Sequence, residues 1–140
     1  MLQMFPLLAV SLIVYTGLTF ALAAAGGAPW VDIQLVALPL ASNEQWAITG
    51  GDVFLVVSMG LLFVELVRAT QTNTSAIANH GLSFLLFLAG LLAFIFVKGF
   101  GNSTFFIYLS MTFLDAMAGM VVTTVTARRD LSVTESSALR

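Results

Sequence analysis

The chain has 140 residues, of which 59% are apolar and only 9% are charged. Soluble domains carry about 25% charged residues, so the composition predicts an integral membrane protein with a lipid-facing surface. A formal charge of −2 gives no basic surface for nucleic acid. The absence of cysteine and the single histidine exclude disulfides, thiolate chemistry and metal sites built from Cys or His clusters.

Four apolar stretches satisfy the length of roughly 20 residues that a helix needs to cross a bilayer core. They cover residues 5–25, 52–68, 80–98 and 103–127. No Lys or Arg precedes the first stretch, and it is longer than a usual signal-peptide core, so we expect it to be a retained span. The sequence predicts an all-α membrane protein, a four-transmembrane-helix bundle in one domain over residues 1–140.

Short polar side chains mark the predicted helix starts. Ser75 is placed to cap the third helix, and Asn102 or Ser103 to cap the fourth, because their oxygens can accept from first-turn N–H groups. Asp52 lies in the first turn of the second helix, where the helix dipole favours a carboxylate. We therefore expect Asp52 to have a capping role.

The positive charges predict the orientation of the spans. One side of a four-span chain holds Arg68, Arg128, Arg129 and Arg140. Lys98 lies alone on the other side, so the positive-inside rule predicts both ends in the cytoplasm, including the tail 128–140. Besides the arginines, we expect Lys98, Trp30 and Trp46 to anchor the protein at the membrane surface.

The first outer loop, residues 26–51, is predicted to be an extended or β-hairpin-like flap. Residues 31–35 alternate apolar and polar side chains, which favours a strand. Residues 45–49 could be its partner, with the turn near 42–44. Pro39 makes a long regular strand unfavourable.

Asp115 is the first candidate for a functional role, because it lies in the middle of the fourth predicted span. Four residues at helical spacing share its face: Tyr108, Thr112, Gly119 and Thr123. A central Asp costs about 2.5–3.5 kcal/mol on insertion scales, so it should face protein or water. It could serve a proton or ion relay, or anchor a partner. The alternative is a packing role, in which a neutral carboxyl donates to Ser58 or Thr16.

Glu65 is the second intramembrane acid, three residues before Arg68 and on the same helix face. Ser58 and Gly51 precede it at seven-residue spacing and extend a narrow polar stripe. One interpretation is a Glu–Arg pair that reaches the membrane surface. The other is a cytoplasmic polar cluster made of Glu65, His80, Arg128 and Arg129.

These landmarks form a pattern over residues 46–130: Trp46, Gly51, Asp52, Glu65, Arg68, His80, Ser103 to Phe106, Asp115, Gly119 and Ala127 to Asp130. The pattern resembles a group of small, four-span, uncharacterised bacterial inner-membrane proteins. The resemblance implies an inner-membrane location and the number of spans. It implies no activity.

Three functions are consistent with these features. The first is a non-catalytic accessory or assembly subunit of a larger membrane complex, which contacts its partner or a second copy through helix faces and the flap. The second is an oligomeric pathway for protons or a small solute, built around Asp115. An enzyme is the weakest, because the sequence offers no nucleophile–base pair, metal set or phosphate cradle.

No cofactor is predicted, although a bound lipid, or a pigment or quinone at the periphery, stays open. The environment of Asp115 separates the first two functions. A water-filled cavity that reaches Asp115 would favour permeation, whereas a carboxyl sealed among hydroxyl groups would favour the subunit.

Overall fold

The computed structural model describes residues 5–69 and 74–138, and their side chains except at 69, 74–80, 122, 123 and 125–138. The described chain is mostly helical, with a short 3-10 turn and a small antiparallel sheet. In chain order the elements are α1 (Leu7–Ala24), η2 (Trp30–Asp32), β1 (Gln34–Pro39), β2 (Gln45–Thr49), α2 (Gly50–Ala69), α3 (Thr74–Phe96) and α4 (Ser103–Ala138).

Three helical segments in the described part of the chain are long and apolar enough to cross a membrane. They are Leu7–Ala24, Gly50–Arg68 and Ser103–Val121. The apolar part of α3 whose side chains are described, Gly81–Phe96, is shorter. The prediction of a mostly helical chain with membrane-length helices is therefore confirmed for three of the four expected spans.

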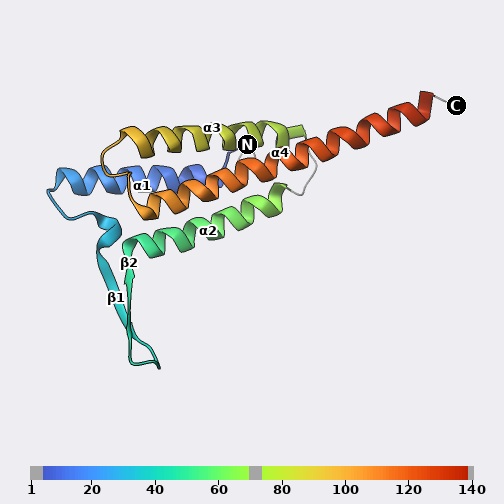
Figure 1. Cartoon of the computed structure of the whole chain (residues 1–140). Helices are drawn as coiled ribbons and strands as arrows, with labels where there is room; N and C mark the ends of the chain where they lie inside the picture. The colour runs from blue at the N-terminus through green and yellow to red at the C-terminus, as the bar shows by residue number, and fades with distance from the viewer. Residues whose placement is uncertain (1–4, 70–73, 139–140) are drawn as a thin grey trace.

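The helices lie alongside one another, with α4 packed against α2 and α3, and α1 against α2 and α3 (Figure 1). The described chain begins and ends toward one end of the helices, and the hairpin leaves from the other (Figure 1). We call the second the hairpin end. α4 remains helical as far as Ala138, through the segment expected to be a tail. Residues 128–138 contain neither Gly nor Pro, so no residue in them interrupts the helix.

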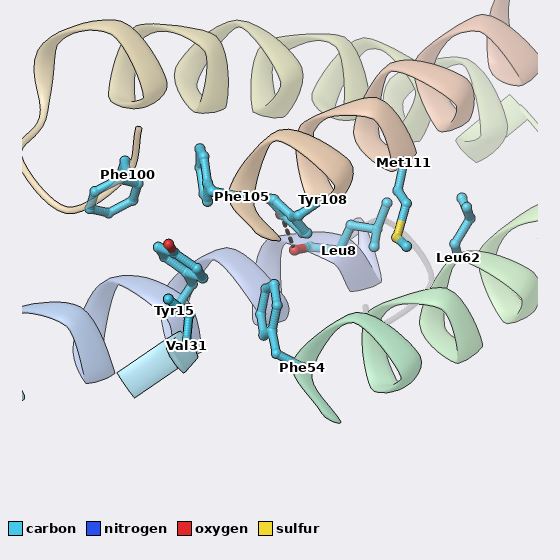
Figure 2. Packing of buried hydrophobic residues seen from close by; sticks show 9 residues of the cluster. All are labelled: Leu8, Tyr15, Val31, Phe54, Leu62, Phe100, Phe105, Tyr108 and Met111. Atoms are coloured by element: carbon cyan, nitrogen blue, oxygen red, sulfur yellow. Dashed lines mark hydrogen bonds between the residues drawn. The ribbon is translucent and has the colours of Figure 1, made fainter. Parts of the chain in front are cut away.

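Tyr15 is the centre of an aromatic cluster at the hairpin end (Figure 2). The centroid of its ring lies 4.7–5.3 Å from those of four other rings, contributed by Trp30, Phe54, Phe100 and Phe105. Such tilted and edge-on pairs add to the stabilisation from burial. The cluster joins α1, η2, α2, α4 and the turn before α4, so it holds the hairpin end together.

The start of α2 is held by a capping box. The Asp52 carboxylate accepts from the backbone N–H and the hydroxyl of Thr49, both at 2.8 Å. The Thr49 hydroxyl oxygen in turn accepts from the N–H of Asp52 at 3.2 Å. This reciprocal arrangement satisfies first-turn donors and confirms the capping role predicted for Asp52.

Two glycines let α2 begin very close to its neighbours. A Cβ atom at Gly50 would lie 2.5 Å from the carbonyl oxygen of Trp30. One at Gly51 would lie 2.7 Å from the Thr104 hydroxyl oxygen. The close approach ties the base of the hairpin to η2 and α4.

The turn between α3 and α4 is organised by Asn102, as predicted for one of its two candidate caps. The Asn102 side-chain oxygen accepts from the N–H of Phe105 at 2.9 Å. Its amide group donates to the Tyr15 hydroxyl at 2.7 Å and to the Gly99 carbonyl at 3.1 Å. The cap for α3 predicted at Ser75 falls on a side chain outside the described set.

The flap is an antiparallel hairpin, as predicted, but its first strand begins three residues later than the alternation suggested. Residues 30–32 form η2 instead, because Trp30 and Val31 pack into the helices. The second strand, Gln45–Thr49, matches the prediction. Pro39 ends β1, where its missing N–H is tolerated. The turn closes through a bond from the Leu40 N–H to the Glu44 carbonyl at 2.8 Å.

Candidate functional site

The interior between the helices contains a set of buried polar side chains. They are Ser11, Ser58, Glu65, Ser83, Thr112 and Asp115. Polar groups at membrane depth need partners within the protein, because lipid supplies none. The partners of these groups therefore indicate what the interior can do.

Glu65 is buried, with 2% of its surface exposed, while Arg68 is exposed. Its Oε2 atom accepts from the backbone N–H of Leu8 at 3.3 Å. Leu8 is in the first turn of α1, whose N-cap Pro6 provides no side-chain cap. The prediction that Glu65 reaches the membrane surface beside Arg68 is therefore wrong. The carboxyl caps α1 from inside the protein, where the helix dipole also favours it.

Tyr108 of α4 binds the same residue of α1 from a second side. Its hydroxyl donates to the Leu8 carbonyl at 2.7 Å, which Figure 2 marks with a dashed line. Leu8 and Tyr108 are both fully buried. We call Glu65, Leu8 and Tyr108 the Leu8 clamp, because α2 and α4 together hold the first turn of α1 through its backbone.

Asp115 has 3% of its surface exposed, and Tyr108, Thr112 and Gly119 on the same face of α4 are also buried. The predicted inward face is therefore confirmed at these four positions, while Thr123 lies outside the described side chains. Phe105 and Leu109 of the same helix are buried too, so the inward face is wider than the predicted set of residues.

Both buried acids, Glu65 and Asp115, are on the inward faces of their helices. Glu65 accepts from the backbone of Leu8, which Tyr108 also contacts, and Asp115 follows Tyr108 by seven residues on the same face of α4. The stripe of Gly51, Ser58 and Glu65 at seven-residue spacing was the signal that α2 turns a polar face inward.

Other hydroxyl groups of the interior bond to one another or to their own helices. Ser58 of α2 donates to Ser11 of α1 at 3.0 Å. Thr112 and Thr16 donate to main-chain carbonyls of their own helices, Leu109 and Leu12, at 2.8 and 2.7 Å. Ser58 thus links two helices, and the Thr16 hydroxyl predicted as a partner for Asp115 is directed to its own backbone.

Three cavities lie near the surface. An apolar groove of about 440 Å³ runs between α1 and α2. Two others, of about 350 and 550 Å³, lie at the hairpin end. Neither Asp115 nor Glu65 lines any of these three cavities. Both carboxyl-bearing residues are buried.

The predicted cytoplasmic cluster cannot be described at every position, because the side chains of His80, Arg128 and Arg129 lie outside the described set. Among the described residues, no group of three or more His, Cys, Asp or Glu side chains could hold a metal ion. Of the predicted surface anchors at the hairpin end, Lys98 and Trp46 are exposed. Trp30 is half-buried, and its indole N–H donates to the Thr19 hydroxyl at 3.0 Å.

The hairpin presents one apolar face, which sequence reasoning did not identify. The register pairs Val36 with Ile48 and Leu38 with Trp46. Because paired and alternate residues share a side of a sheet, these four side chains form a single apolar face. The opposite face holds Ala37, Pro39, Ala47 and Gln45, with smaller or polar side chains. Val36 and Trp46 have 50% and 53% of their surfaces exposed, and Leu38 is exposed as well.

Comparisons with protein-family models, with curated proteins and with solved structures found no match to this chain. The resemblance to small bacterial inner-membrane proteins thus stays a prediction.

Proposed function

We propose that this chain is a non-catalytic accessory subunit of a larger membrane complex, and that its hairpin docks on a neighbouring membrane protein. The observation that carries the proposal is the hairpin's apolar face, made of the exposed side chains of Val36, Leu38 and Trp46 and the half-buried Ile48. Aromatic and aliphatic side chains gathered on one exposed face are typical of an interaction surface.

The hairpin has little support of its own, which strengthens this argument. A two-stranded hairpin is marginally stable in water. Here all of β1 and most of β2 are exposed, and the helices hold only its base. A partner that covers the apolar face would bury Trp46 and its neighbours and stabilise both strands.

The direction of the hairpin indicates which kind of partner fits. It points across the helix direction, to the side of α2 (Figure 1). If the helices cross a bilayer, such a hairpin reaches over the membrane beside them. The partner is therefore a neighbour in the same membrane with an apolar surface at the lipid boundary.

We propose that all four helices cross the membrane. Three of them are long and apolar enough to do so, and α3 is included because it packs along α4. The positive-inside rule supports an orientation with the hairpin outside the cytoplasm, and the bacterial inner membrane is the proposed location. The burial of Glu65 and Asp115 supports a subunit more than a permeation pathway.

The test is purification of the tagged chain from its native membrane in mild detergent, with mass spectrometry of stoichiometric companions. The triple variant Val36→Ser, Leu38→Ser and Trp46→Ser removes the apolar face. The control variant, Ala37→Ser and Ala47→Ser, changes the opposite face of the same hairpin.

We expect the wild type and the control to retain a membrane-protein companion at constant ratio and the triple variant to lose it. A photoreactive residue at position 38 should crosslink to that companion, and one at position 47 should not. Retention by the triple variant, or crosslinks only between copies of this chain, would overturn the proposal.

A second candidate function is an oligomeric proton pathway, favoured by the two acids, Glu65 and Asp115, that are buried in the interior. Its test is proton flux into liposomes that contain the purified chain. Flux that falls in both Asp115→Asn and Glu65→Gln would support this pathway. No flux above that of protein-free liposomes would exclude it.

A further inference from the structure

Two adjoining cavities form a recess at the hairpin end, where α1 stops and the turn before α4 passes. Their volumes are about 350 and 550 Å³. They share the wall residues Pro29, Val31, Lys98 and Gly99. We call the two together the hairpin-end recess. It is distinct from the exposed hairpin face and from the Leu8 clamp.

The larger cavity of the recess is lined by two opposite charges, Asp32 and Lys98. Both side chains are exposed, and Lys98 is the only lysine of the sequence. In the described part of the chain, neither of them forms an ion pair with the other or with a third residue. The recess thus offers one cationic and one anionic group to a ligand.

The remaining polar groups of the recess are engaged within the protein. The Tyr15 hydroxyl donates to the Gly99 carbonyl at 3.2 Å and accepts from Asn102. The Trp30 indole N–H is bonded to Thr19. These bonds shape the floor of the recess and leave the two charges as the groups available for recognition.

The smaller cavity adds an apolar compartment beside the charges. Its wall on α1 includes Phe20, Leu22 and Ala23, close to the helix end. Apolar side chains at this level meet lipid tails, while Lys98 lies where a headgroup would be. A ligand that fills both cavities is therefore amphipathic, with a charged head and an apolar tail.

The pair of charges decides the kind of head. A purely anionic head would be attracted by Lys98 but repelled by Asp32. A purely cationic head would be attracted by Asp32 but repelled by Lys98. A head that carries phosphate and ammonium together satisfies both. A primary ammonium can donate hydrogen bonds to a carboxylate, as a lysine side chain does, whereas a quaternary one cannot.

We propose that the hairpin-end recess binds one phospholipid with an ethanolamine-type headgroup. The phosphate contacts Lys98, the primary ammonium contacts Asp32, and an acyl chain lies along the last turns of α1. The inference rests on the membrane placement of the helices. It does not depend on the partner proposed for the hairpin, because the recess lies at its base and not on its apolar face.

The test is native mass spectrometry of the full chain in mild detergent, titrated with phosphatidylethanolamine, phosphatidylcholine or phosphatidylglycerol. Lys98→Gln removes the phosphate contact. Glu44→Gln is the matched control, because it removes an acid of the hairpin turn that does not line the recess. Thermal unfolding verifies that each variant is folded, as the exposure of these side chains leads us to expect.

We expect the wild type and Glu44→Gln to retain phosphatidylethanolamine over phosphatidylcholine by at least tenfold. We expect Lys98→Gln to weaken retention of both lipids severalfold, because both carry the phosphate that contacts Lys98. Equal retention of the three lipids by the wild type would overturn the proposal. So would stabilisation by inorganic phosphate alone with the same dependence on Lys98, because that result would indicate an ion site.

Asp32→Asn gives a sharper outcome than loss of binding. Without the carboxylate, the recess no longer repels a net negative headgroup, so retention of phosphatidylglycerol should rise severalfold relative to phosphatidylethanolamine. A nonspecific lipid contact would leave this ratio unchanged, and an unchanged ratio contradicts the proposed contact. Loss of the hairpin's partner in the earlier experiment would not affect this ratio, so the two proposals fail separately.

Discussion

The Leu8 clamp and the hairpin differ in which side chains they bury and which they expose. In the clamp, the backbone of Leu8 is bonded on two sides by Glu65 and Tyr108, both buried. The hairpin extends away from the helices (Figure 1), and its Leu38 and Trp46 side chains are exposed. Polar groups are thus concealed where lipid would leave them without partners, and apolar groups are displayed where a partner can cover them. Stability should depend on the first region and recognition on the second.

The largest expected effect on stability comes from the clamp. Glu65→Ala removes the acceptor of the Leu8 N–H and leaves a space between α1 and α2. We expect the free energy of unfolding to fall by about 2–3 kcal/mol, since the bond involves a buried carboxyl. Thermal unfolding in detergent micelles measures the change.

Glu65→Gln is the matched control, because its amide oxygen can still accept from Leu8 and its size is nearly the same. It should lose no more than about half as much free energy. If Gln and Ala destabilise the protein equally, the bond to Leu8 is not what Glu65 contributes.

The next largest effect tests the base of the hairpin. Gly50→Ala places a Cβ atom 2.5 Å from the Trp30 carbonyl oxygen, so backbone must move. We expect a loss of about 1–2 kcal/mol from this overpacking. Gly60 of the same helix has no neighbour within 4 Å of such an atom. Gly60→Ala should therefore be neutral or stabilising, and a similar loss at both positions would show that close packing at Gly50 is unimportant.

The sequence was sufficient to predict features that depend on local pattern. Apolar runs gave the membrane-length helices, and the spacing around Asp115 gave the inward face of α4. The caps at Asp52 and Asn102 followed from residue type and position. Each of these needs only the residues of one helix and its first turn.

The features that were wrong or missed depend on contacts between distant segments. Glu65 lies 57 residues from its partner Leu8, so nothing near it in sequence distinguishes a buried cap from a surface acid. The start of β1 moved because Trp30 and Val31 pack on the helices as η2. The apolar face of the hairpin required the register, and the alternation alone did not give it.

A smaller effect is expected on the other side of the clamp. Tyr108→Phe removes the hydroxyl that donates to the Leu8 carbonyl but keeps the ring in the aromatic cluster. Hydrogen bonds between membrane helices contribute little on average, so we expect a loss of about 0.5–1 kcal/mol in the same unfolding assay. A loss as large as that of Glu65→Ala would mean that Tyr108 supports more than this bond.

The smallest effect on stability is expected on the hairpin, and it completes the contrast. Trp46→Ser changes a side chain with 53% of its surface exposed, so the free energy of unfolding should change by less than about 0.5 kcal/mol. The same variant should weaken co-purification of the membrane companion, because aromatic side chains dominate the energy of most interfaces. A variant that unfolds the protein would instead show that Trp46 supports the fold. If Trp46→Ser loses the companion but keeps its stability, Trp46 serves recognition and does not support the packing of the fold.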